Sequence, residues 1–417
     1  MVRRSPDGKR EIADTSGAFG FIGIFPTKVH TGRSATLDSP ALTKTDSLKT
    51  CLASKRVSLD NLECVPITRN PGCIAGVTQD DSASREYSEL LALDMHVLII
   101  TPPRPSRHSG NNVTAFRWRR MLKELGHKVE VQSEYTNEPC DVLVVLHARR
   151  NAAVIRRYRH QHPASPMIVV LTGTDLYRDL ERSRSARASL EFASRLLLLQ
   201  LDGLARLPRR LAHKSRVIYQ SAVPPARRPD PLKQCFEVCV IGHLRAEKDP
   251  LRAAMAARRL PASSRIRVVH LGMAMEPTWQ TRAQREMKVN PRYQWLGEMS
   301  RGRTQQRLAR SRLLVMSSRI EGGANAVSEA LAADVPVLAS RISGNVGMLG
   351  ADYPGYFPVG DTGALAELLV RAETEPIFYQ SLCDHCRERA KLVDPARERR
   401  DWDNLLGEFL WEACGST

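Results

Sequence analysis

The stretch that decides the fold is Leu313–Glu329, which reads Leu-Leu-Val-Met-Ser-Ser-Arg-Ile-Glu-Gly-Gly-Ala-Asn-Ala-Val-Ser-Glu. Its apolar start, Leu313–Ser317, is typical of a strand that is buried on both faces. The sequence then predicts a helix over 325–333, after a loop that contains two glycines. A strand, a short loop and a helix in this order form one unit of a parallel α/β sheet.

The same unit recurs on both sides of this stretch, before and after a segment rich in proline. In the first half we predict strands at 96–101, 128–132, 141–146, 167–172, 196–199 and 217–220, with helices at 113–125 and 151–162. In the second half we predict strands at 236–241, 266–271, 293–296, 313–317 and 335–339, with helices at 250–259, 303–310, 325–333, 362–373, 376–390 and 396–412. This repetition predicts two doubly wound halves, whose ligands bind at the carboxyl ends of the strands.

The segment that separates the halves, Pro224–Pro231, is stiff because it contains four prolines. The final helix is expected to pack back on the first half through Trp402 and Trp411. The predicted divisions are a first domain over 95–225, a linker over 226–235, a second domain over 236–395 and a C-terminal helix over 396–417.

Residues 1–94 differ from the rest of the chain in composition. They are rich in Ser, Thr, Gly and Pro and show no sustained strand or helix period. In one interpretation Met95 is the natural start or 1–94 is a dispensable leader; in the other the segment is a real accessory part. Charged residues at positions 7, 9–11 and 14 stand where a signal peptide has its apolar region, so we expect no export. Nine Cys residues without regular spacing favour a reducing, cytoplasmic location.

The formal net charge is +17, and its distribution along the chain is uneven. Residues 1–94 contain 12 basic and 12 acidic side chains, so the whole excess belongs to 95–417. The excess of basic residues in 95–417 favours partners that carry phosphate, whether nucleic acid, anionic lipid or small molecules. The basic residues are interleaved with acidic ones and form no zinc-finger or RNA-recognition motif, which argues against nucleic acid. No uncharged run reaches the ~18–20 apolar residues of a membrane helix, so we expect no membrane partner.

The most specific chemical feature is a pair of carboxylates, Glu321 and Glu329, separated by seven residues. Gly322 and Gly323 permit a close approach of the backbone to a ligand. A helix that begins near Asn325 directs free N–H groups toward an anion such as a diphosphate. Glu321 can accept hydrogen bonds from the hydroxyls of a sugar, and Glu329 can accept both hydroxyls of a ribose. The alternative is a capped surface helix with incidental acidic residues.

A basic segment after the first strand of the second half favours the ligand-binding interpretation. Arg245 and Lys248 stand at the end of this strand, where two cations can clamp phosphates. Together with the two carboxylates, they resemble the family 4 glycosyltransferases, which have two Rossmann-like domains facing each other across a cleft (the GT-B fold). The resemblance covers about 95–410 and implies a nucleotide-sugar donor. In that family the basic pair holds the nucleotide diphosphate, the first Glu holds the sugar and the second holds the ribose.

The resemblance extends to the loops of the first half, which would carry the acceptor. The residues assigned to the donor are Gly110, Asn111, Arg245, Lys248, Glu321, Gly322, Gly323, Ala324, Asn325 and Glu329. His147 and Asp175 stand at strand ends and are the candidate catalytic residues, orienting the acceptor or assisting phosphate removal by general acid–base action. The residues assigned to an anionic acceptor are Arg104, Arg107, Arg149, Arg150, Thr172 and Thr174.

These segments are similar to one subgroup in particular, the selenosugar synthases of selenoneine biosynthesis. The similar segments are Ser109–Ala115, Leu146–Arg150, Leu171–Tyr177, Gly242–Arg245 and Glu321–Asn325. This subgroup joins the sugar of a UDP-sugar, typically UDP-N-acetylglucosamine, to the selenium of selenophosphate. The resemblance therefore implies a UDP-sugar and selenophosphate as substrates, no cofactor and no bound metal. It also implies a functional link to a selenophosphate synthetase and to a selenoneine-forming enzyme.

The residues alone leave alternatives open. A family 4 glycosyltransferase with an ordinary hydroxyl acceptor is the alternative enzyme, and a basic nucleic-acid-binding protein is the alternative class. Each arginine can belong to a solvated face, His147 can be a hydrogen-bonded strand-end residue, and Asp175 can be a helix cap. Cys383 and Cys386 have CxxC spacing in a helical stretch, which we interpret as core rather than as a metal or redox site.

Overall fold

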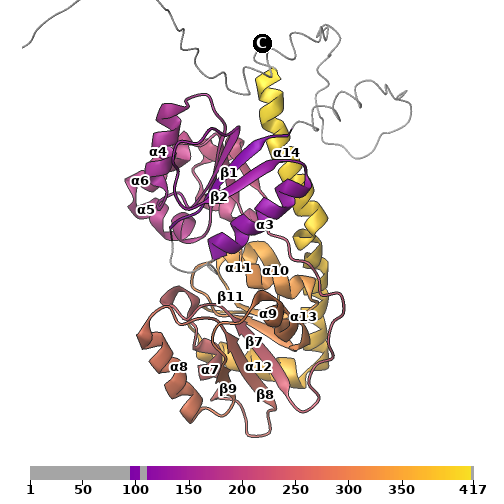
Figure 1. Cartoon of the computed structure of the whole chain (residues 1–417). Coiled ribbons are helices and arrows are strands. Elements are labelled where there is room, and N and C mark those ends of the chain that lie inside the picture. Colours follow the sequence, from indigo (N-terminus) through magenta and orange to yellow (C-terminus); the bar gives the residue numbers. More distant parts are fainter. Residues whose placement is uncertain (1–93, 104–109, 415–417) are drawn as a thin grey trace, which may run out of the picture. The chain divides into compact units, whose positions relative to one another are not determined.

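Two six-stranded sheets, parallel in every pairing, organise the described part of the chain (Figure 1). The computed structural model describes residues 94–103 and 110–414. The interpretations of segment 1–94 and the predicted acceptor contacts Arg104 and Arg107 lie outside the described residues. All described residues fall in one unit of the chain, so the two sheets can be considered together.

The first sheet has the strand order β2-β1-β3-β4-β5-β6. Its strands are β1 His96–Ile100, β2 Lys128–Gln132, β3 Val142–Leu146, β4 Met167–Leu171, β5 Arg195–Leu198 and β6 Ser215–Val217. The helical segments of this half are α3 Gly110–Glu124, α4 Ala152–Gln161, η2 Asp175–Asp179, α5 Leu180–Arg182, α6 Arg184–Phe192, η3 Leu201–Arg206 and η4 Arg209–Lys214.

Helices cover both faces of the first sheet, because alternate residues of its strands are apolar on both sides. Val97 and Ile99 of β1 belong to a core that includes side chains of α3. Leu98 and Ile100, which point the other way, belong to a second core with side chains of α4 and α6. This is the doubly wound arrangement that the apolar strand runs predict.

The second sheet has the order β12-β11-β10-β7-β8-β9. Its strands are β7 Phe236–Ile241, β8 Ile266–Leu271, β9 Tyr293–Trp295, β10 Leu313–Met316, β11 Val337–Ser340 and β12 Tyr356–Phe357. Its helical segments are η5 Ala246–Lys248, α7 Arg252–Ala257, α8 Pro277–Val289, α9 Arg301–Arg310, α10 Asn325–Ala332, α11 Ser343–Leu349, α12 Thr362–Thr374, α13 Pro376–Arg389 and η6 Ala390–Val393. The chain ends in a long helix, α14 Pro395–Cys414.

Most predicted strands and helices agree with the structure to within a few residues. The last strand of the first half is an exception, because β6 lies at Ser215–Val217 rather than at 217–220. The sequence analysis also missed α6, α8 and α11. In α8 only Ala283 and Glu286 are buried. Its apolar stripe is narrow, with Trp279, Ala283 and Met287 among many polar residues, so the helical period is weak in the sequence.

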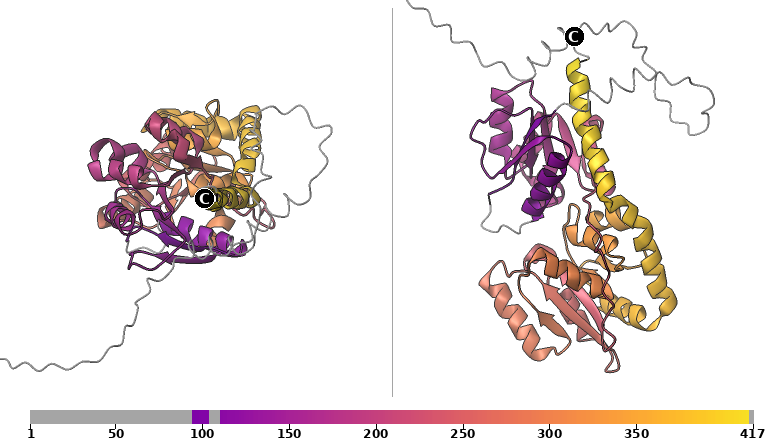
Figure 2. Two further views of the ribbon diagram at one scale, coloured as in Figure 1. Left: turned by 90° about the horizontal axis from the view of Figure 1, so that it is seen from above. Right: turned by 45° about the vertical axis from the view of Figure 1, so that its right-hand side comes forward.

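The last helix returns to the first half, as predicted. The expected packing is confirmed for Trp402 and is wrong for Trp411. Trp402 is fully buried and its ring lies 4.8 Å from that of Trp118 on α3, in an edge-to-face contact. Both views show α14 beside α3 (Figure 2). Trp411 is 60% exposed, because the helix has turned its side chain away from the core. Among the residues that the structure describes, no helix is both long and apolar enough to cross a membrane.

The two tryptophans of α14 provide a matched test of how this helix is anchored. We expect Trp402→Ala to lower the free energy of unfolding by about 3–5 kcal/mol, because it leaves a large cavity beside Trp118. Trp411→Ala on the same helix should change it by about 0.5 kcal/mol or less. Urea unfolding followed by circular dichroism measures both. Equal effects of the two substitutions would contradict this anchoring.

Candidate functional site

A cavity of about 690 Å³ opens at the carboxyl ends of both sheets. Its walls come from the start of α3, the loops after β3 and β4, the loops after β7, β9 and β10, and the first turns of α10. Predicted site residues that line it are Gly110, Asn111, His147, Arg150, Thr172, Thr174, Arg245, Lys248, Glu321, Gly323, Ala324, Asn325 and Glu329. Arg149, Asp175 and Gly322 do not line it.

Glycine residues bring the two halves into backbone contact beside the cavity. A Cβ atom on Gly173 would lie 2.8 Å from the backbone nitrogen of Gly322, and one on Gly322 would lie 2.5 Å from the carbonyl carbon of Thr172. A Cβ on Gly323 would lie 2.7 Å from the Leu199 Cβ. The glycines after Glu321 therefore allow the halves to approach each other, a role that the sequence analysis did not foresee. Gly323 also lines the cavity, so close approach of this backbone to a ligand stays a prediction.

The start of α10 forms part of the cavity wall. Ala324, which precedes the helix, provides no side-chain cap, and Ala324, Asn325 and Ala326 all line the cavity. Asn325 Oδ1 accepts a hydrogen bond of 2.9 Å from Nη1 of Arg117 on α3. No side-chain cap takes up the first N–H groups of the helix, so they can bind an anion in the cavity. The binding of an anion here stays a prediction.

Three basic residues from both halves meet at the cavity. Lys248 forms an ion pair with Glu321, so these two predicted ligand-binding groups neutralise each other here. Arg245 lines the cavity, and its buried Nε has no hydrogen-bond partner among the described residues. Burial lowers the pKa of Arg150, and the positive charges of Arg149 and Arg245 lower it further. This region therefore favours an anionic ligand.

Glu329 lines the same cavity and lies beside a different cation, Arg301. Its carboxylate is largely buried and lies 3.9 Å from Arg301 Nε. Burial raises the pKa of Glu329, although the positive charges of Arg301 and Arg117 act in the opposite direction. The sequence analysis did not single out Arg301, because it placed the start of α9 at residue 303 and left Arg301 in a loop.

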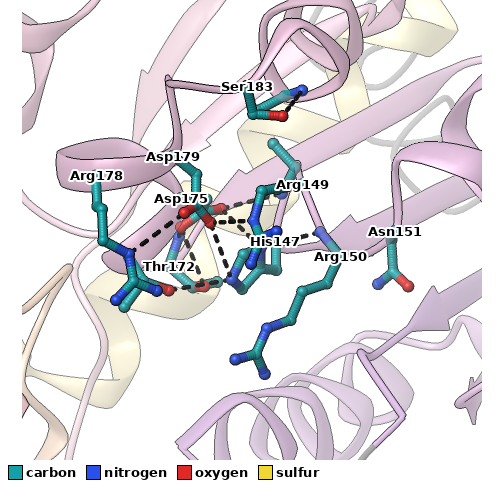
Figure 3. Close-up of polar contacts among 12 residues, drawn as sticks. His147, Arg149, Arg150, Asn151, Thr172, Asp175, Arg178, Asp179 and Ser183 are labelled. Atoms are coloured by element: carbon teal, nitrogen blue, oxygen red, sulfur yellow. Dashed lines mark hydrogen bonds and ion pairs between the residues drawn. The ribbon is translucent and has the colours of Figure 1, made fainter. Parts of the chain in front are cut away.

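The loop after β3 turns sharply at His147, whose φ is +75°. This turn places the imidazole at the cavity, with Nε2 3.1 Å from the hydroxyl of Thr174. The Nδ1 atom accepts a hydrogen bond of 3.3 Å from the backbone N–H of Arg150. Figure 3 shows the Arg150 side chain pointing away from Asp175 and Asp179, whose carboxylates lie near His147 and Arg149.

Asp175 lies behind the cavity wall, which corrects its prediction as a group that contacts the reacting atoms. Its side chain is fully buried and accepts hydrogen bonds from the backbone N–H groups of Ala148 (3.0 Å) and Thr172 (2.8 Å). These bonds join the loops after β3 and β4 (Figure 3). Asp175 is therefore a positioning residue for His147 and Thr172 rather than a catalytic one.

Arg149 is also held away from the cavity. Its Nε donates to Asp179 Oδ2 at 2.8 Å, whereas Arg178 pairs with both Asp179 and Glu247 of the second half. The prediction that Arg149 contacts the acceptor is therefore not supported by its place in the structure. Sequence spacing alone could not have revealed the contact between Arg149 and Asp179, since the two residues are 30 positions apart.

Neither a metal cluster nor a paired-cysteine site emerges from the described ranges. No group of three or more His, Cys, Asp or Glu side chains suited to a metal ion occurs in 94–103 or 110–414. Cys383 and Cys386 are buried on α13, and burial raises the pKa of the Cys386 thiol to about 11. Cys386 Sγ lies 3.4 Å from the Tyr353 hydroxyl, which agrees with the core interpretation of this pair.

The raised pKa of Glu329 predicts a stability that depends on pH. Folding raises this pKa above 4.5, so the ionised carboxylate destabilises the folded chain at neutral pH, and this cost disappears below 4.5. We expect Glu329→Gln to increase the free energy of unfolding at pH 7.5, with a gain that vanishes toward pH 4.

Urea unfolding at both pH values measures this gain. The exposed Glu367 on α12 provides a control, because Glu367→Gln should leave the difference between the two pH values unchanged. A loss of stability at pH 7.5, or a gain of equal size at both pH values, would contradict the inference that the ionised Glu329 carboxylate destabilises the folded chain.

Comparison with known proteins agrees with this architecture. Residues 227–393 match the family described as "Glycosyl transferases group 1". The structure resembles that of Anabaena HepE in complex with UDP and glucose, with a TM-score of 0.59 at 14% identity over 75% of this chain and 100% of that one. It also resembles the sucrose-phosphate synthase of Thermosynechococcus elongatus, with a TM-score of 0.59 at 14% identity over 77% and 100% of the two chains.

A third similar structure is an α,α-trehalose-phosphate synthase (UDP-forming) from Burkholderia xenovorans in complex with glucose-6-phosphate. Its TM-score is 0.54 at 11% identity, over 64% of this chain and 73% of that one. At these identities the likeness concerns the fold. Residues 227–393 thus match the model of the group 1 glycosyl transferases, and the described chain has the GT-B fold of two facing α/β sheets.

Proposed function

We propose that this protein transfers a sugar, N-acetylglucosamine, from a UDP-sugar to selenophosphate, forming a carbon–selenium bond and a selenosugar for selenoneine biosynthesis. The observation that carries the proposal is the composition of one wall of the cavity. Arg245, the start of α10 and Glu329 all line the cavity. Together they offer what a nucleoside diphosphate needs, a cation and free N–H groups for the phosphates and a carboxylate for the ribose. A volume of about 690 Å³ is within the range of ~300–1,000 Å³ for ligand pockets.

The donor half of the proposal assigns a chemical task to each group. Arg245 and Lys248 would bind the diphosphate through charge-assisted hydrogen bonds, with the N–H groups at the start of α10. Glu329 would accept the hydroxyls of the ribose, and Glu321 those of the transferred sugar. The similar structure of Anabaena HepE was solved with UDP bound, and that likeness supports UDP as the nucleotide here.

The acceptor half rests on the segments similar to the selenosugar synthases and on the first-half wall of the cavity. Arg150, Thr172 and Thr174 would hold the phosphate of selenophosphate there. Selenium is already nucleophilic, so the step needs orientation and positive charge more than a strong base. The selenium attacks the anomeric carbon, the bond from that carbon to the UDP oxygen breaks, and UDP leaves with the bonding electrons.

Removal of the phosphate completes the reaction. Water attacks phosphorus, the phosphorus–selenium bond breaks, and the selenium keeps the electron pair and takes up a proton. His147 is the group that would hold or move this proton, because its ring lines the cavity. In the neutral ring, Nδ1 accepts from the Arg150 N–H, so Nε2 carries the proton and donates to the Thr174 hydroxyl.

An ordinary acceptor hydroxyl is the second candidate. The same phosphate-binding residues would suit a sugar phosphate, and a structure similar to this one was solved with glucose-6-phosphate. We further propose that the enzyme acts in the cytoplasm without a bound metal or other cofactor, and without nucleic acid or membrane as partners. A selenophosphate synthetase would supply its acceptor, and a selenoneine-forming enzyme would use its product.

The first test mixes the full chain with UDP-N-acetylglucosamine and freshly generated selenophosphate. We expect UDP to form together with a sugar that carries the isotope pattern of selenium in mass spectrometry, and neither product to form without selenophosphate. UDP binding without a selenium product, across several UDP-sugars, would reject selenophosphate and leave the hydroxyl acceptor. Absence of UDP binding would reject the donor assignment as well.

The second test concerns the donor cation. We expect Arg245→Gln to weaken UDP binding by about 10- to 100-fold, since a hydrogen bond to a charged group contributes roughly 1.5–3 kcal/mol. Arg319→Gln is the matched control, because Arg319 is exposed in the same half and does not line the cavity. Isothermal titration calorimetry measures both affinities. Equal affinity in the two variants would contradict the role of Arg245.

A further inference from the structure

A second cavity, of about 300 Å³, lies where α3, the start of α9, the segment that follows β6 and the start of α14 meet. Four arginines line it, and the lining contains one carboxylate, Glu124. The arginines are Arg117, Arg120, Arg301 and Arg399. Four guanidinium groups against one carboxylate make this an electropositive site that the donor and acceptor assignments leave without a role.

Two further carboxylates stand outside the lining and compensate part of this charge. Glu398 lies behind Arg117, with Oε2 3.3 Å from Arg117 Nε, and is already bonded to Trp118 and Ser221. Glu329 lies 3.9 Å from Arg301 Nε and itself faces the large cavity.

The cations that are least compensated are Arg120 and Arg399. Glu124 accepts a hydrogen bond of 3.0 Å from Arg399 Nη2, but it lies 3.8 Å from Arg120 Nε. The Nε of Arg399 is a buried atom without a hydrogen-bond partner among the described residues. A buried donor left unpaired costs free energy, and an anion in the cavity would provide the missing acceptor.

We propose that this second cavity binds a small oxyanion of the phosphate type, held by Arg399, Arg120 and Arg117. A tetrahedral oxyanion matches the planar donor geometry of guanidinium groups, which bind phosphate oxygens through paired N–H bonds. Burial and the charge of Arg301 lower the pKa of Arg117, and the negative charge of an anion beside it would act in the opposite direction.

The site would also communicate with the large cavity. Arg117, Arg120 and Arg301 line both cavities, so an anion in one shares its cations with an anion in the other. Two anions near the same cations repel each other, which predicts that phosphate weakens the binding of a diphosphate ligand. This coupling rests on the proposed donor function, whereas binding of the oxyanion does not.

The first experiment titrates the full chain with inorganic phosphate, without UDP, and follows the melting temperature against chloride of equal ionic strength. We expect a saturable rise for the natural chain, an apparent affinity at least about tenfold weaker in Arg399→Gln, and a severalfold tighter one in Glu124→Gln. Arg400→Gln, the exposed neighbour on α14, should behave like the natural chain. A phosphate effect that is the same in all variants, or is lost in Arg245→Gln instead, would overturn the proposal.

The second experiment measures UDP affinity with and without saturating phosphate. We expect phosphate to raise the dissociation constant of UDP severalfold, and Arg399→Gln to remove most of this change while leaving UDP binding in phosphate-free buffer unaffected. Arg399 does not line the large cavity, so its substitution removes a contact of the oxyanion without removing a contact of UDP. An equal phosphate effect in Arg399→Gln would reject the coupling. Failure of UDP binding itself would reject the donor assignment and leave the melting-temperature result to decide the oxyanion site.

Discussion

The backbone contact between Gly173 and Gly322 is the constraint on which the cavity depends. A Cβ atom on either residue would enter the backbone of the other loop, so the two sheets can approach only where side chains are absent on both sides. Gly173 also has a φ of +125°, which L-residues with side chains rarely adopt. Because the loops touch here, Thr172 and Thr174 of one half face the same space as Glu321 of the other.

The last helix acts on this cavity through a chain of polar contacts. Glu398 of α14 accepts hydrogen bonds from Trp118 of α3 and from Ser221 in the segment after β6, and pairs with Arg117. Arg117 then donates to Asn325 at the start of α10. Buried ion pairs add little net stability, because the desolvation of both charges opposes their attraction. Here the pair instead fixes the orientation of Arg117, and with it the position of α3 beside the cavity wall.

The sequence was sufficient for the fold because both sheets consist of unbroken apolar strand runs that alternate with loops and helices. It was also sufficient to bring Arg245 and Glu329 to the same cavity, since segments that follow the carboxyl ends of parallel strands meet at one edge whatever the details of packing. It failed for Asp175 and Arg149, whose side chains satisfy backbone and carboxylate groups of neighbouring loops. A residue at a strand end can face the ligand or support the loop, and only the contacts between distant segments decide which. Gly323 shows the same limit, since its neighbour Leu199 belongs to the other half.

The Lys248–Glu321 pair shows how such a cavity can hold opposite charges before a ligand arrives. Each group is partly buried, and an isolated buried charge would be costly, so mutual pairing compensates both. A nucleotide sugar would offer a phosphate to the lysine and hydroxyl donors to the glutamate, in exchange for the bond between them. Neither charge would lose a partner in this exchange, and the ligand would need to bring both chemical groups at once. A diphosphate without a sugar would satisfy only the lysine, so on the proposed function the pair favours the complete donor over its product.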